Sequence, residues 1–313
     1  MIRIGIDIGG TGVKIGAVDS GRNLIAEHAI PTRTDIPFPE QVRQIWTGVL
    51  DTIRKANLTA DDIESIGVGI PGIASRKTGE IIKCTNMGWD YVPFREEMRK
   101  YTDRPVLIEN DANVAALAES IAGISAGTSS SVFITIGTGI GSGIIINGKI
   151  WSGYHGIGGE LGHVIMRLDG VPCTCGNRGC LERYCAATAL IRMAREKVAD
   201  HPESLILRSV DGDETKIMAR TVIDCAREGD PIAVEVYQEY ISYLAQAIAG
   251  VVNLLDPEVV VLGGGVCNAG DFLLDPIRKE FPKHVIFSDQ PLPEIKIAVL
   301  GNKAGMIGAA MLS

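Results

Sequence analysis

The stretch IRIGIDIGGTGVKIGAVD, residues 2–19, decides the fold of this chain of 313 residues. It reads as two apolar strands joined by a glycine-rich turn, because apolar residues alternate or run continuously on either side of the glycines. The pattern starts again in SSVFITIGTGIGSGIIING, residues 130–148, with a strand, a glycine turn and a returning strand. We therefore expect two similar α/β halves, each opening with a glycine-rich hairpin.

Strands and helices alternate behind the first hairpin. NLIAEHAIPT (23–32) continues as a third strand, and a helix follows from about Pro39. The apolar runs SIGVGIPG (65–72) and PVLIEN (105–110) read as further strands, the second followed by a helix. Apolar strands that alternate with helices are typical of a parallel or mixed sheet covered on both faces.

The second half repeats this organisation. Its periodicity predicts three helices, over about 181–199, 215–228 and 231–255. The apolar strand PEVVVLGGGV (257–266) breaks into glycines, and the chain ends in a helix that we expect to pack back on the first half.

Two lobes with a cleft between them follow from the apparent duplication. We assign 1–115 plus about 300–313 to an N-terminal lobe and 116–299 to a C-terminal lobe that carries a cysteine loop. Two domains also agree with a length of 313 residues, at roughly 100–200 residues per domain.

Composition excludes several classes of protein. A net charge of -8 argues against a nucleic-acid surface. No apolar run reaches the roughly 18 residues that span a membrane, and the first residues show no signal-peptide core. The seven cysteines are an odd number, and four stand in strand-like or helix-like contexts, which favours reduced thiols and a cytoplasmic location.

The first glycine turn has the groups that bind phosphates. Gly9 and Gly10 lack side chains, so backbone N–H groups can approach phosphate oxygens. Thr11 adds a hydroxyl donor, Lys14 a positive charge, and Asp7 a carboxylate for Mg²⁺. The alternative is an ordinary glycine hairpin with an aspartate on its strand.

A second turn, Gly137–Thr138–Gly139, repeats this arrangement at the matching position of the other half. Two such turns indicate a nucleotide whose phosphates are held between the lobes, although neither is a Walker A loop. Gly264 and Gly265 would let a flat ring lie against the backbone at the carboxyl end of a strand. A tight strand-to-helix turn would explain these two glycines equally well.

Asn110 and Asp111 stand where a strand ends and a helix begins. Asp111 is compatible with a helix N-cap, which is a common role. The same position suits a cleft-facing carboxylate that accepts a proton from a substrate hydroxyl.

Three cysteines in the polar loop CTCGNRGCLE, residues 173–182, have the appearance of a metal site. A closed structural zinc site needs a fourth ligand beside Cys173, Cys175 and Cys180. His163 is the nearest candidate and His155 is a second one. A cluster of core thiols or a regulatory disulfide would be the alternative.

Taken together, the motifs DIGGTG, IPG, ENDANVAALAE, GTGIGSG, GGELGH, CTCGNRGCLE and GGGV resemble the ROK (repressor, ORF, kinase) family, in order and spacing, over almost the whole chain. The closest likeness is to the glucokinases of that family. The resemblance implies a two-lobed actin/hexokinase-like ATPase fold, with duplicated ribonuclease-H-like domains. It also implies a homodimer or homotetramer.

Roles for individual residues follow from the same resemblance. It implies structural Zn²⁺ on His163, Cys173, Cys175 and Cys180, with Asp111 as the catalytic base. The groups that bind the sugar would be Gly72, Asn110, Asp111, Glu160, His163 and Glu182. ATP and Mg²⁺ would meet Asp7, Gly9, Gly10, Thr11, Lys14, Gly137, Thr138, Gly139, Gly264 and Gly265.

The implied activity is transfer of phosphate from ATP to the 6-hydroxyl of a hexose, with glucose as the expected substrate. Alternatives within the same chemistry are N-acetylmannosamine, fructose or allose as acceptor and polyphosphate as donor. A sugar-responsive repressor and an actin- or Hsp70-like ATPase without a sugar acceptor are the alternatives from other classes.

Overall fold

The computed structural model describes residues 1–313, which divide into two compact units. Unit 1 comprises Met1–Ser129, Gly143–Gly159 and Val299–Ser313, and unit 2 comprises Ser130–Ser142 and Glu160–Ala298. This division differs from the expected boundary at 115/116, because all of helix α3 belongs to unit 1. Within α3, Ala118 packs with Ala304 and Ile307 of the C-terminal segment in a small apolar cluster.

The main sheet of unit 1 has the strand order β3–β2–β1–β4–β8. Its strands are β1 (Ile2–Ile8), β2 (Gly12–Val18), β3 (Leu24–Pro31), β4 (Ile63–Ile70) and β8 (Val106–Asn110). Pairing is antiparallel between β1, β2 and β3, and parallel between β1, β4 and β8. The predicted hairpin, third strand and mixed sheet are therefore confirmed.

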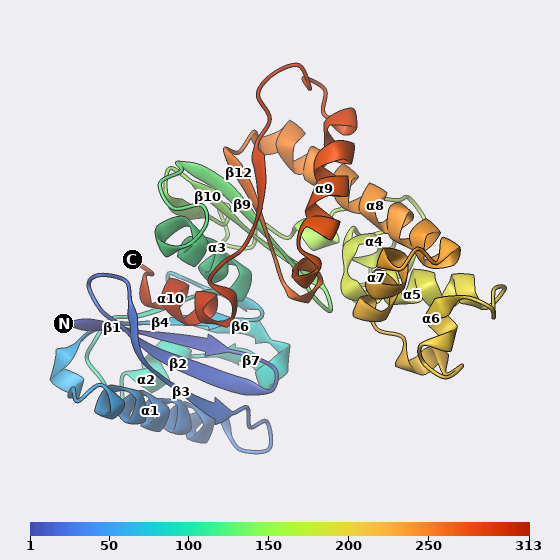
Figure 1. The fold of residues 1–313 in the computed structure, drawn as a ribbon. Helices are drawn as coiled ribbons and strands as arrows, with labels where there is room; N and C mark the ends of the chain where they lie inside the picture. The colour runs from blue at the N-terminus through green and yellow to red at the C-terminus, as the bar shows by residue number, and fades with distance from the viewer. The chain divides into compact units, whose positions relative to one another are not determined.

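Helices cover both faces of this sheet (Figure 1). One face carries α1 (Phe38–Lys55) and α2 (Phe94–Met98), and the other carries α3 (Asp111–Ala122) and α10 (Ala304–Ala310). A small antiparallel sheet stands beside them, made of β5 (Ile73–Ala74), β6 (Ile81–Cys84) and β7 (Trp89–Val92).

The C-terminal helix α10 lies directly on the backbone of the sheet, as the sequence predicted. A Cβ atom on Gly5 would lie 1.8 Å from the carbonyl oxygen of Met306, and one on Gly67 would lie 1.7 Å from that of Ala309. Only residues without a side chain permit this approach. Glycines in β1 and β4 therefore fix the last helix of the chain against the strands that carry the first hairpin.

The second sheet has the order β11–β10–β9–β12–β13. Its strands are β9 (Ser130–Ile136), β10 (Ile140–Ile146), β11 (Lys149–Trp151), β12 (Val259–Gly263) and β13 (Glu294–Ile297). The division between the units falls within β10. Central β12 pairs in parallel with β9 and β13 and is buried along its whole length, as expected of a strand covered on both faces.

The helices of unit 2 surround α8 (Pro231–Leu255). The others are α4 (Glu182–Cys185), α5 (Ala187–Val198), α6 (Leu205–Arg208), α7 (Ala219–Arg227) and α9 (Asp271–Glu280). The helix predicted over 181–199 is therefore two helices, because the chain is extended at Ala186. The break lets the backbone N–H of Ala187 donate to the carbonyl of Gly137 (2.9 Å), so α5 begins on the second glycine turn.

Candidate functional site

The β1–β2 hairpin of unit 1 brings the first set of predicted residues together. The backbone N–H of Gly9 donates to the carbonyl of Gly12 (3.0 Å), and Gly10 and Thr11 are exposed at the tip. Asp7 and Lys14 are paired across the two strands. The turn therefore presents a hydroxyl and accessible backbone beside a carboxylate and an ammonium group.

The carboxyl group of Asp7 lies against the start of α10. A Cβ atom on Gly305 would be 2.5 Å from its Cγ, so the closeness depends on that glycine. Burial raises the pKa of Asp7 above its ordinary value, and the nearby charge of Lys14 offsets part of this rise. The ionised form of Asp7 is thus less favourable in the folded protein without ligands than in the unfolded chain.

Asp7→Asn should therefore make the protein without ligands more resistant to heat at neutral pH. A raised pKa contributes stability that is present below the ordinary value of 3.8 and lost as the pH rises through the folded value. The variant's gain in melting temperature should be clear at pH 8 and should shrink toward pH 4.

Exposed Asp35 is the matched control, because hydrogen bonding to Arg33 lowers the pKa of its carboxyl group. Asp35→Asn should not raise the melting temperature at pH 8. An unchanged or lower melting temperature for Asp7→Asn at pH 8 would contradict the assigned cost of burying this charge.

At the end of β8, Asn110 is the N-cap of α3, and Asp111 is the first residue of the helix. The side-chain oxygen of Asn110 accepts from the backbone N–H groups of Ala112 (2.9 Å) and Asn113 (3.2 Å). Its Nδ2 donates to the carbonyl of Gly72 (3.3 Å), so three of the predicted sugar residues of unit 1 form one group. The capping role considered for Asp111 thus belongs to its neighbour.

The carboxylate of Asp111 accepts from the backbone N–H of Ala112 (2.9 Å) through Oδ1. It stands at the first position of α3, at the positive end of the helix macrodipole. A carboxylate at the junction of a strand and a helix has the chemistry of a general base.

In unit 2 the Gly137–Gly139 turn is held from two sides. The hydroxyl of Thr188 donates to the carbonyl of Thr138 (2.8 Å) from the first turn of α5. From the other side, Glu182 Oε2 accepts from the backbone N–H of Ile140 (2.9 Å). A Cβ atom on Gly139 would lie 2.3 Å from the same carboxylate oxygen, so this glycine makes room for Glu182.

The three loop cysteines and His163 converge in unit 2. One ligand atom from each of the four residues lies within 4.8 Å of the others. The Sγ atoms of Cys175 and Cys180 are 3.6 Å apart, and Cys173 Sγ is 3.7 Å from His163 Nδ1. Around a tetrahedral Zn²⁺, bond lengths of about 2.3 Å to sulfur and about 2.0 Å to nitrogen place neighbouring ligands roughly 3.5–3.8 Å apart. These donors therefore fit zinc in both kind and spacing.

The other predicted acids of unit 2 lie beside this cluster. Glu182 Oε1 is 4.0 Å from Cys173 Sγ, so one side chain connects the cysteine loop to the glycine turn. Glu160 is exposed and immediately precedes the short helix Leu161–His163, and the backbone N–H of His163 donates to its carbonyl (3.0 Å). A metal bound to His163 would thus fix the backbone next to Glu160.

The glycines after β12 differ in their surroundings. Gly264 has a φ of 89°, and a Cβ atom there would be 2.4 Å from the carbonyl oxygen of Ile136. Gly265 has nothing within 4 Å of the corresponding position. The tight turn expected as an alternative is therefore present at Gly264, and the backbone at Gly265 is accessible.

Two residues with a part in this arrangement were not predicted. Thr188 holds the second glycine turn, and no local pattern distinguishes it from other threonines near a helix start. Glu109 is a buried carboxylate next to Asn110, and its signal was a charged residue inside the otherwise apolar run PVLIEN.

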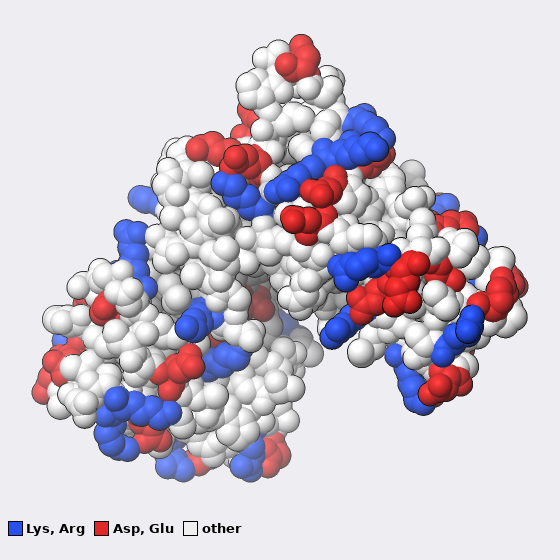
Figure 2. All heavy atoms as spheres, viewed as in Figure 1, with Lys and Arg blue, Asp and Glu red and all other residues white.

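On the face drawn in Figure 2, basic and acidic side chains are interspersed: Lys and Arg atoms lie among Asp and Glu atoms. The helices are also too short or too polar for any of them to cross a membrane.

Comparison with known proteins gives matches along the whole chain. The model of the ROK family matches residues 3–313. The glucokinase of Halalkalibacterium halodurans is 36% identical over 315 residues, which cover 99% of this chain and 94% of that protein. The xylose repressor of Caldicellulosiruptor bescii is 28% identical, over 97% of this chain and 76% of the repressor.

Among solved structures, a ROK family glucokinase from Streptomyces griseus, in complex with glucose and AMPPNP, is similar with a TM-score of 0.81. The two sequences are 34% identical, and the alignment covers 99% of this chain and 98% of that one.

Proposed function

Because this chain belongs to the ROK family, we propose that it is an ATP-dependent sugar kinase that phosphorylates glucose at its 6-hydroxyl group. The resemblance seen in the motifs and the actin/hexokinase-like fold are both confirmed by the relatives. The observation that carries the proposal is the carboxylate of Asp111 at the end of β8, placed on the first turn of α3.

Asp111 is the proposed catalytic base. Phosphoryl transfer needs little covalent chemistry from the protein, so positioning and charge neutralisation dominate. The carboxylate would orient the 6-hydroxyl group toward the γ-phosphate and accept its proton. The hydrogen bond that its Oδ1 accepts from the backbone N–H of Ala112 holds the carboxylate in place, which supports this role.

The proposed sugar ligands are taken from the family resemblance, and each group is supported by its own local geometry. They are Gly72, Asn110 and Asp111 of unit 1 and Glu160, His163 and Glu182 of unit 2. A pyranose presents hydroxyl groups around its rim, which suits a set of acids and amides. The hydrogen bond from Asn110 to Gly72 supports the grouping in unit 1.

The proposed contacts to ATP are the two glycine turns and the turn after β12. Gly9, Gly10, Thr11, Lys14 and Gly137–Gly139 would meet the phosphates, and Gly264 and Gly265 the adenosine. Asp7 would hold Mg²⁺, which usually keeps several waters and needs only one or two carboxylates beside the phosphates. When bound, Mg²⁺ would neutralise charge on the phosphate oxygens.

We assign structural Zn²⁺ to His163, Cys173, Cys175 and Cys180. Four protein ligands make a closed site, which leaves no position for a substrate. In the structure Nδ1 of His163 faces Cys173, so Nε2 is left to donate a hydrogen bond to the sugar. One histidine can thus act as metal ligand and sugar ligand at once.

A coupled assay with Mg²⁺ tests the proposal directly. Glucose, N-acetylmannosamine, fructose and allose should each be offered with ATP and, separately, with polyphosphate. The expected result is ADP formation that depends on glucose, with glucose 6-phosphate as product and the highest kcat/KM of the panel. The proposal fails if no phosphorylated sugar forms, as for a repressor, or if ATP hydrolysis is indifferent to sugars, as for an actin-like ATPase.

A further inference from the structure

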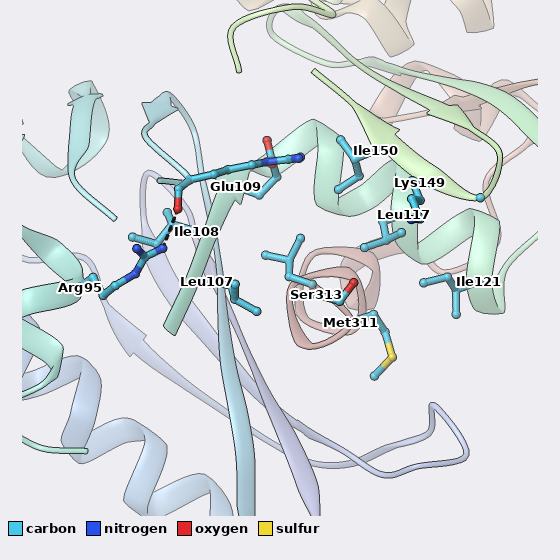
Figure 3. A pocket seen from close by; sticks show the side chains of 13 residues that line it. Arg95, Leu107, Ile108, Glu109, Leu117, Ile121, Lys149, Ile150, Met311 and Ser313 are labelled. Atoms are coloured by element: carbon cyan, nitrogen blue, oxygen red, sulfur yellow. Dashed lines mark hydrogen bonds and ion pairs between the residues drawn. The ribbon is translucent and has the colours of Figure 1, made fainter. Parts of the chain in front are cut away.

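Glu109 is a carboxylate buried in the wall of a cavity of about 480 Å³ in unit 1. It is only 4% exposed. Figure 3 labels it on β8, among the residues that line the cavity, which include Ile108 and Ile150. Leu117 and Ile121 of α3 and Met311 near the C-terminus line the same cavity. A carboxylate in such surroundings is costly unless each oxygen has a partner.

One oxygen of Glu109 holds the turn into α3. Its Oε1 accepts from the backbone N–H of Asn110 (3.0 Å) and from Nδ2 of Asn113 (2.8 Å). Asn113 in turn donates its backbone N–H to the side chain of Asn110. Glu109 therefore contacts the residue immediately before Asp111 and the residue two positions after it.

The other oxygen of Glu109 is ion-paired with Arg76. Both Nε and Nη2 of the guanidinium group face Oε2. Arg76 lies in the connection between β5 and β6, and its backbone carbonyl accepts from Nη2 of Arg95 (2.9 Å). The ion pair therefore connects the β5–β6 loop, which Arg95 holds in place, to the end of β8 immediately before Asp111.

Three residues of the protein thus donate hydrogen bonds to one buried carboxylate. Glu109 itself is not among the proposed ligands of ATP or of the sugar. We infer that Glu109 is a positioning residue, which holds Asn110 and Asp111 in the geometry for proton transfer while Arg76 balances its charge. The inference rests on the proposed role of Asp111 as catalytic base. A misplacement of about 1 Å in such a group can cost on the order of 100-fold in rate.

Glu109→Gln tests this inference because a carboxamide has one acceptor oxygen where the carboxylate has two. The introduced carboxamide cannot serve Asn110, Asn113 and Arg76 together, so the turn should loosen while the volume of the side chain stays the same. We expect kcat to fall on the order of 10- to 100-fold and KM for glucose to rise, because Asn110 is itself a proposed sugar ligand, with KM for ATP within about twofold of the unchanged protein.

Two further variants separate positioning from mere stability. Arg76→Gln in the Glu109→Gln background supplies an acceptor for the new amide group and should restore part of kcat. In the Asp111→Asn background, Glu109→Gln should cause little further loss, because residues that act through one another are not additive.

Glu64→Gln is the matched control, since it removes a carboxylate from an Arg–Glu pair on the surface of the same sheet, Arg3–Glu64 (3.0 Å). It should leave kcat unchanged. Melting temperatures of all variants should be measured beside the kinetics.

An unchanged kcat in Glu109→Gln would overturn the inference, as would a loss of the same size in the Asp111→Asn background. A loss of kcat that follows only the fraction of unfolded protein would do so too. Full activity of the single variant Asp111→Asn would instead show that Asp111 is not the catalytic base. Failure of the proposed function can therefore be distinguished from failure of the inference about Glu109.

Discussion

Asp111→Asn is expected to lower kcat for glucose phosphorylation by about 10³-fold, the usual scale for the loss of a general base. The substitution keeps the local structure, because the oxygen of the introduced amide can still accept the hydrogen bond that Asp111 Oδ1 takes from the backbone N–H of Ala112. What it removes is the group that accepts the proton of the sugar hydroxyl. Initial rates over a range of glucose concentrations would measure the effect.

Binding measurements provide the control for this variant. Affinity for ATP and the zinc content should match those of the unchanged protein, since neither depends on a proton acceptor at position 111. A variant that kept more than about a tenth of kcat would rule out Asp111 as the base, because a base contributes at least about 100-fold.

Cys175→Ala is expected to release the zinc bound by each chain and to raise KM for glucose on the order of tenfold. Cys175 is the exposed member of the cluster, so its loss should create no cavity in the core. Without the metal, the loop of Cys173 and the segment of Glu160 and His163 lose their common anchor, and sugar ligands that are no longer held in place bind less well. Affinity for ATP should change much less.

Metal analysis together with glucose titration checks this expectation. Cys225→Ala is the matched control, because Cys225 is a buried thiol of α7 outside the cluster. That variant should keep its zinc and its KM. Unchanged affinity for glucose in zinc-free Cys175→Ala would show that the metal does not order the sugar ligands.

Much of the fold was predictable because its signals are local. Strand periodicity around glycines identified both hairpins, and the helix of Pro231–Leu255 was predicted with its bounds. The error over 181–199 has a tertiary cause. Local propensity favours one continuous helix there, but the backbone opens at Ala186 to bond the glycine turn of a distant strand.

The candidate site was likewise predicted in part from the sequence and in part only from the tertiary structure. The residue types and spacing of the cysteine loop predicted a metal site with His163 preferred to His155, and the structure brings His163 together with the three cysteines. Asp111 was recognised as either a cap or a base, and the hydrogen bonds of Asn110 showed which residue is the cap.

By itself, then, the sequence determined the class of fold, the two glycine turns and the chemistry offered by the cysteine loop, since these depend on neighbouring residues. The tertiary structure alone decided how Glu182 connects the turn to the loop, how α10 lies on Gly5 and Gly67, and what surrounds Glu109. These contacts join residues far apart in the chain, and no local preference specifies which of many possible partners packing brings together.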